Sequence, residues 1–166
     1  MKVAAFGSLV SLGLLGFLPS SHADEVKIAL KDVPKVVVDA IKAKFPAGEM
    51  TEAAKETEDG KTTYEVTLKD GGKAVDIALT AAGVILEIEK EVAAKDLPKA
   101  VASAIEAKYP KATLTKAEEI SAFADGKESK FFEVVLTTDA KKMVEVKLSP
   151  EGKILEEETG EEDKDE

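Results

Sequence analysis

Carboxylates, serine hydroxyls and lysine ammonium groups are the side chains of this sequence that could take part in chemistry. The sequence has no cysteine, and its single histidine, His22, lies near the N-terminus. Paired glutamates such as Glu65 and Glu133 could act as a general acid and a general base. Both, however, lie on predicted strand faces that also carry Thr63 and Thr137, which favours solvent-facing strand residues.

The serines beyond the N-terminal segment have no base available to them, because that part of the chain has neither histidine nor cysteine. These serines are Ser103, Ser121, Ser129 and Ser149. Nucleophilic serine chemistry therefore has no support in the sequence. We predict that the protein is not an enzyme, and that it has no catalytic residue and no cofactor.

Three aspartate–glycine turns could supply oxygen ligands to calcium. They lie at Asp59, Asp70 and Asp125. A calcium loop needs several oxygen ligands at alternating positions and a closing glutamate, but lysine follows the turns at residues 59–60 and 125–126. The pattern is instead typical of hairpin turns. We predict no metal site, and we interpret the acidic C-terminal residues as a solvated tail.

The charge of the chain limits its partners. Asp and Glu together number 33 against 23 basic residues, which gives a formal net charge of −10. All of the basic residues are lysines, so no guanidinium group can grip a phosphate or a carboxylate with two hydrogen bonds. An acidic chain repels nucleic-acid backbones and anionic membrane surfaces. We therefore predict no nucleic-acid partner.

The first 23 residues have the pattern of a secretory signal peptide. Met1 and Lys2 give a positive start, an apolar run extends to Leu18, and Ser21 and Ala23 occupy the small positions before the cleavage point. The apolar run is shorter than the roughly 20 residues that a membrane-spanning helix needs. We predict cleavage after Ala23, a periplasmic or secreted location, and no membrane insertion after cleavage.

An internal repeat organises the rest of the chain. The segment DVPKVVVDAIKAKFP at residues 32–46 returns as DLPKAVASAIEAKYP at 96–110, with nine of fifteen positions identical. Apolar residues in each copy recur at four-residue steps, which predicts a short helix with one apolar face. The closing proline prevents the helix from continuing, because the residue before a proline is pushed out of the helical region.

Each copy continues with alternating segments that predict antiparallel strands joined by short turns. In the first copy the strands are expected around 50–57 and at 62–68, 74–79 and 84–89. We therefore predict an α+β protein of two tandem repeats, each with one helix packed on a four-stranded antiparallel meander.

The repeat also sets the predicted domain boundaries. The join at residues 90–95 is short and has no Gly or Pro, so we expect no flexible linker between the repeats. The last residues are nearly all acidic, which predicts disorder. The predicted parts are a signal peptide at 1–23, the first repeat at 24–90, the second repeat at 91–158, and a disordered acidic tail at 159–166.

The ordered set of these motifs resembles the PepSY-like family, which is also called putative beta-lactamase-inhibitor-like. In the second copy the resemblance rests on LPKAV at 97–101, KYP at 108–110, DGK at 125–127, FEV at 132–134 and GKILE at 152–156. The first copy has matching motifs, and together they cover nearly all of residues 27–157. The resemblance implies a small exported domain with a helix on an antiparallel sheet. It also implies protein binding or inhibition by fold analogy, and no catalytic residues.

One difference between the two copies indicates a partner site. The outward face of the predicted strand at 62–68 is polar, whereas its match in the second copy carries Phe131 and Val135, and the next strand adds Met143. Exposed apolar clusters mark interaction sites. Two interpretations are open: this face packs against the first repeat or the region near residue 50, or Phe131, Val135 and Met143 contact a protein or peptide.

The sequence thus predicts an exported binding module that contacts or inhibits another protein of the cell envelope. We expect the module to be a monomer. Its stability must come from the core alone, because no disulfide can form without cysteine. The alternative is an acidic periplasmic protein that binds or senses cations. The two differ in whether calcium produces heat on binding to the full-length and tail-deleted chains.

Overall fold

The computed structural model describes residues 26–58 and 60–159. The predicted signal peptide, Asp59 and residues 160–166 of the predicted acidic tail lie outside the described residues. The described part of the chain forms nine strands, two α-helices and two short 3-10 helices. None of the helices in this part is long and apolar enough to cross a membrane.

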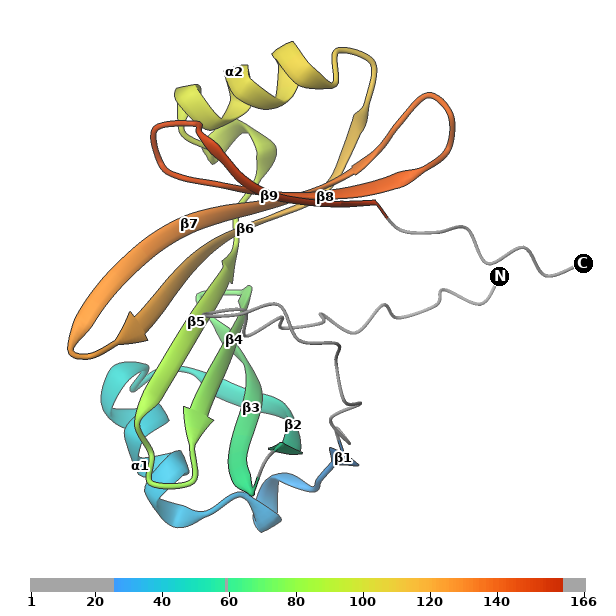
Figure 1. The fold of residues 1–166 in the computed structure, drawn as a ribbon. Helices are drawn as coiled ribbons and strands as arrows, with labels where there is room; N and C mark the ends of the chain where they lie inside the picture. The colour runs from blue at the N-terminus through green and yellow to red at the C-terminus, as the bar shows by residue number, and fades with distance from the viewer. Residues whose placement is uncertain (1–25, 59, 160–166) are drawn as a thin grey trace, which may run out of the picture.

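All nine strands belong to one antiparallel sheet, and their order in the sheet is their order along the chain (Figure 1). The strands are β1 Val26–Lys27, β2 Glu49–Glu58, β3 Lys61–Asp70, β4 Lys73–Thr80, β5 Ile85–Glu91, β6 Thr113–Ala124, β7 Lys127–Thr137, β8 Met143–Leu148 and β9 Ile154–Thr159. The longest strands, β6 and β7, form one hairpin that extends beyond its neighbours toward the side of the molecule that carries α1 (Figure 1).

Each half of the sheet carries one helix. The helix α1, Lys35–Lys44, lies beside the half built from β2 to β5, and α2, Lys99–Lys108, lies beside the half built from β6 to β9 (Figure 1). A 3-10 turn precedes each helix: η1, Leu30–Asp32, and η2, Ala94–Asp96. Both helices begin directly after a proline, whose fixed φ suits a helix start, and both are followed by an aromatic residue and then a proline.

The predicted fold class is wrong. We expected an α+β protein with two repeats, each of one helix on a four-stranded meander, but the protein is mostly β, with one continuous nine-stranded sheet and two ten-residue helices. The two halves join because β5 pairs with β6 over five consecutive residue pairs, from Glu87 opposite Ala122 to Glu91 opposite Glu118. The free backbone groups of β5 are thereby satisfied by the next strand of the chain rather than left at an edge.

The core lies on the side of the sheet that carries the helices. One group of buried residues joins α1 to the first half of the sheet and includes Ile41, Leu68 and Ile77; a second group joins α2 to the other half and includes Val101 and Leu148. The apolar residues predicted to line the helices are buried, as expected from their spacing, except Tyr109, which is half-buried. Because side chains alternate along each strand, the residues between the buried ones face the opposite side of the sheet.

Candidate binding face

The side of the sheet opposite the two helices is the candidate site, and we call it the helix-free face. On β4, Val75, Ile77 and Leu79 are buried in the core with α1, whereas Asp76 alternates with them and points to the helix-free face. The strand register carries this alternation across the sheet, because residues directly opposite each other on paired strands share a face. The face can therefore be followed from strand to strand.

Acidic side chains cross the middle of the helix-free face from β4 to β8. The register sets Asp76 opposite Glu89 and Glu118 opposite Glu133. Five neighbouring strands contribute to this set, which we call the carboxylate row. Its members are Asp76, Glu87, Glu89, Glu118, Glu133 and Glu145.

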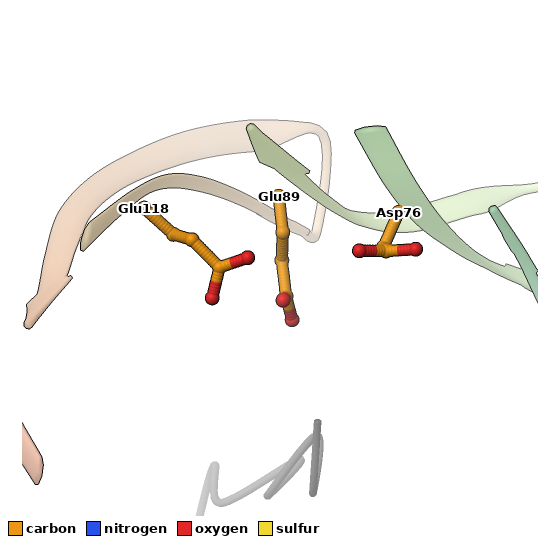
Figure 2. A group of neighbouring side chains, drawn as sticks. All are labelled: Asp76, Glu89 and Glu118. Atoms are coloured by element: carbon orange, nitrogen blue, oxygen red, sulfur yellow. The ribbon is translucent and has the colours of Figure 1, made fainter. Parts of the chain in front are cut away.

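The tightest part of the row is the group Asp76, Glu89 and Glu118. One carboxylate oxygen from each lies within 4.8 Å of the others. Figure 2 shows the three side chains next to one another, on the same side of the strands that carry them. Glu89 and Glu118 are only 5% and 4% exposed. Three acidic groups are thus held together with little water to screen them, which makes their simultaneous ionisation costly.

Two lysines offset part of this charge. The Nζ of Lys116 lies 2.8 Å from a carboxylate oxygen of Glu118. The Nζ of Lys147, on β8, lies 5.0 Å from the ring centre of Phe131 and lowers the pKa values of Glu87 and Glu133 by its charge. With two lysines against six carboxyl groups, the row keeps an excess of acidic groups.

Burial and the neighbouring carboxylates keep Glu89 protonated. Burial is the larger cause, and the nearby Glu118 and Glu87 add to it, so that the pKa of Glu89 rises from 4.5 to about 9. A hydrogen bond between the Glu87 and Glu89 side chains contributes in the same direction for Glu89 and lowers the pKa of Glu87. At neutral pH, Glu89 is therefore the protonated member of this pair and donates its hydrogen bond to Glu87.

A second pair of the same kind lies two strands away. Burial, followed by the charge and hydrogen bond of Glu145, raises the pKa of Glu133 to about 8. The pKa of Glu118 is also raised by burial, although Lys116 opposes the shift. Glu133 is half-buried and hydrogen-bonded to Glu145, whereas the sequence led us to expect a solvent-facing strand residue. Its predicted companion Glu65 lies on β3, four strands away in the sheet, so these two carboxylates do not form a pair.

The raised pKa of Glu89 gives a stability that depends on pH. A carboxyl group whose pKa is raised on folding contributes stability that is fully present below about 4.5 and is lost as the pH rises through about 9. Glutamine keeps a hydrogen-bond donor for Glu87 but cannot ionise. We expect Glu89→Gln to raise the Tm at pH 9 by about 5 °C and to change it little at pH 5.

Thermal unfolding followed by circular dichroism at pH 5, 7 and 9 measures this effect. The matched control is Glu106→Gln on the exposed side of α2, which should leave the difference between the two pH values as it is in the wild type. An equal Tm change at pH 5 and pH 9 for Glu89→Gln would contradict the assignment of the proton to Glu89.

The three predicted partner residues lie on the same helix-free face. Phe131 and Val135 are on β7 and are half-buried, and Met143, at the start of β8, is 39% exposed. They do not form one compact cluster, because Met143 pairs with Thr137, six residues from Phe131 and so about 20 Å along the strand. Acidic members of the carboxylate row lie between them. Their role in partner binding stays a prediction.

The other candidates from the sequence lie away from this face or within ordinary elements. Asp70 closes β3 at its turn into β4, and Asp125 lies at the tip of the β6–β7 hairpin, so both occupy the hairpin turns that were predicted. Asp59 lies outside the described residues. Ser121 is within β6, on the side that carries the helices.

Comparison with known proteins assigns the chain to a family. The family model described as "Putative beta-lactamase-inhibitor-like, PepSY-like" matches residues 21–87 and again residues 62–156. No curated protein sequence matches this chain. The two matches to the family model together span most of the 166 residues. They confirm the resemblance that was predicted from the sequence.

Solved structures from Bacteroides species share the fold. A protein of Bacteroides eggerthii described as a putative periplasmic protein has a TM-score of 0.66 at 12% identity, covering 76% of this chain and 88% of its own. A DUF2874 family protein of Bacteroides ovatus has a TM-score of 0.63 at 15% identity, covering 76% and 86%. A BLIP-like protein of Bacteroides fragilis has a TM-score of 0.61 at 20% identity, covering 89% and 93%.

The periplasmic description of the B. eggerthii neighbour agrees with the periplasmic or secreted location predicted from the N-terminal segment. Because the sequence identities are low, these neighbours show the fold of the chain but identify no ligand or partner. The two matches to the family model carry the assignment. This chain belongs to the PepSY-like family.

Proposed function

We propose that this protein is a non-enzymatic binding module of the cell envelope, and that its helix-free face receives a lysine- or arginine-rich segment of another protein. The observation that carries the proposal is the carboxylate row. It places six carboxyl groups on five adjacent strands of the sheet. Glu89 and Glu133 hold protons at neutral pH. The other four carboxyl groups still outnumber the two lysines of the row, Lys116 and Lys147. Charge complementarity steers such a partner to the face and fixes its orientation.

The small size of a hollow on this face supports a macromolecular partner over a small ligand there. The hollow between Glu133, Glu145 and Lys147 has a volume of about 20 Å³, which holds about one water molecule. A small molecule would gain little burial there, since small-molecule sites are usually clefts of several hundred Å³. A protein surface can instead cover the row as a whole.

Apolar groups beside the row supply the other part of such an interface. Phe131 and Val135 keep part of their surface exposed on β7, and Met143 follows on β8. The side chain of Phe131 already carries the ammonium of Lys147 over its ring, an interaction that a partner cation could also make. Interfaces of this kind combine a few apolar anchors with charges that set the specificity.

Charge reversal on the helix-free face tests the proposal. Immobilised mature protein would be used to capture proteins from an envelope extract, alongside the charge-reversal variant Glu145→Lys and the ring-truncation variant Phe131→Ala. We expect each variant to weaken capture of a basic partner by more than about tenfold, and 0.5 M salt to weaken wild-type capture as well. Glu106→Lys on the exposed side of α2 is the matched control and should capture as the wild type does.

Capture that is indifferent to both substitutions, with the variants folded by circular dichroism, rejects the face as the binding surface. Loss of capture in the Glu106→Lys control as well would mean that net charge, rather than this face, governs the interaction. Each of these outcomes argues against a defined binding surface on the sheet.

Cation binding is the second candidate function, and the group Asp76, Glu89 and Glu118 is the observation that favours it. The group offers three carboxylate oxygens, whereas calcium takes six to eight oxygen ligands. Lys116 also neutralises Glu118, and Glu89 holds a proton near neutral pH. Calorimetric titration with calcium decides between the two: heat that disappears in Glu89→Gln would favour this second function.

A further inference from the structure

A cleft lined by several lysines lies on the side of the sheet that carries the helices. It occupies a place on that side that neither helix covers. It has a volume of about 220 Å³ and lies at the junction of the two halves. Three lysines from three elements line it: Lys44 at the end of α1, Lys90 on β5 and Lys130 on β7. This convergence stands out in a chain whose net charge is −10.

The lysines of the cleft are held in different ways. The ammonium of Lys90 lies 5.5 Å from the centre of the Phe45 ring, which fixes its position without neutralising its charge. Lys130 Nζ lies 3.2 Å from a carboxylate oxygen of Glu119, but both side chains are partly exposed, so this pair is weak and can be exchanged. Lys44 makes no ion pair with another residue among those that the structure describes.

The floor and the remaining wall of the cleft define the ligand further. Ile88, which is 4% exposed, and the half-buried Phe123 provide an apolar floor. Ser121 adds a hydroxyl group. Two glutamates, Glu119 and Glu128, also line the cleft, so that three positive charges face two negative ones. The balance favours an anion, and the floor favours one that carries carbon beside its charge.

We propose that this cleft binds a carboxylate on a short aliphatic chain, such as a small organic acid or a glutamate side chain of a peptide. The carboxylate lies between Lys90 and Lys130 and displaces Glu119 from Lys130. Its methylene groups lie on Ile88 and Phe123, where they are removed from water. A cleft of about 220 Å³ leaves room for a ligand of this size.

Titration of ¹⁵N-labelled protein, followed by NMR, tests the cleft with glutarate as the probe. We expect shifts of the amide signals around Ile88, Ser121 and Lys130, with a Kd on the order of 1 mM. Lys90→Met and Lys130→Met should each weaken binding about tenfold, because each removes one charge-assisted hydrogen bond. Methionine at position 90 keeps a favourable contact with the Phe45 ring, so folding is preserved.

Three controls make the test specific. Lys69→Met, on β3 and outside the cleft, should bind glutarate as the wild type does. Glutaramide has the same carbon chain without charge and should cause no saturable shifts. Phosphate should bind more weakly than glutarate, since it cannot use the apolar floor, and the peptide acetyl-Gly-Glu-Gly-amide shows whether a glutamate side chain is accepted as well as a free acid.

Equal shifts with glutarate and glutaramide, or unchanged affinity in both lysine variants, would overturn the proposal. Glutarate binding that phosphate matches would reduce the cleft to a general anion site and would also contradict it.

Discussion

Replacing Gly152 by alanine should lower the free energy of unfolding by about 3 kcal/mol. Gly152 lies in the turn between β8 and β9 with φ +82°, a backbone conformation that side chains with a Cβ rarely adopt. A Cβ at this position would also lie 2.4 Å from the carbonyl oxygen of Ala100 in α2. Because the clashing atom belongs to the backbone, α2 itself must move away from the sheet.

A second glycine separates the two parts of this effect. Gly126, in the turn between β6 and β7, also has a positive φ, +72°, but a Cβ there would meet nothing within 4 Å. Gly126→Ala should therefore show the backbone strain alone, about 1 kcal/mol. Urea unfolding of both variants measures the difference, and equal losses at the two positions would mean that the contact with Ala100 is not tight.

The same contact explains why the internal repeat keeps a glycine at this point. Gly83, the counterpart of Gly152 in the first repeat, has φ +79°, and a Cβ there would lie 2.8 Å from the carbonyl oxygen of Val36 in α1. The sequence predicted only a strand at 84–89, directly after Gly83, and a family motif that begins at Gly152. The structure shows that the turn and the start of the helix also touch through backbone atoms, and a sequence pattern does not contain this distance.

Local periodicity predicted the helices and the buried faces of β3, β4, β7 and β8 well. The four-residue steps in the helices identified Val37, Ile41, Val101 and Ile105, all of which are buried. Such a period reports the environment of a residue within its own element. It does not report which strand is the next neighbour, because a strand alternates in the same way beside any partner. The pairing of β5 with β6, and with it the single sheet, could therefore not be derived from the pattern.

The carboxylate row was missed for the same reason. Asp76, Glu89 and Glu118 lie on three different strands, and only the register brings their oxygens together. One signal was available in the sequence: Glu87, Glu89 and Glu91 alternate along a segment that had to be an interior strand if the repeats shared a sheet. Charged side chains are typical of the edge strands of a sheet, where they discourage pairing with another chain. Three glutamates in an interior strand therefore indicate that one face of the sheet is polar and serves a function.

The continuous sheet has a consequence for folding that two separate units would not have. Ile77 is fully buried in the first half and Leu148 is fully buried in the second. Truncating either side chain to alanine removes buried methyl groups and leaves a cavity, which should cost about 3 kcal/mol. Because the β5–β6 pairing couples the halves, we expect either substitution to lower one common unfolding transition.

The chain carries its own reporters for this test. It has two tyrosines and no tryptophan; Tyr64 packs against the core of the first half and Tyr109 against that of the second. In a Tyr109→Phe background, tyrosine fluorescence reports the first half alone, and in a Tyr64→Phe background it reports the second. Leu148→Ala, in the second half, should shift the urea midpoint reported by Tyr64 as much as the midpoint reported by Tyr109. Ile77→Ala, in the first half, should likewise shift both midpoints equally. A shift confined to the mutated half would show that the two halves unfold independently despite sharing one sheet.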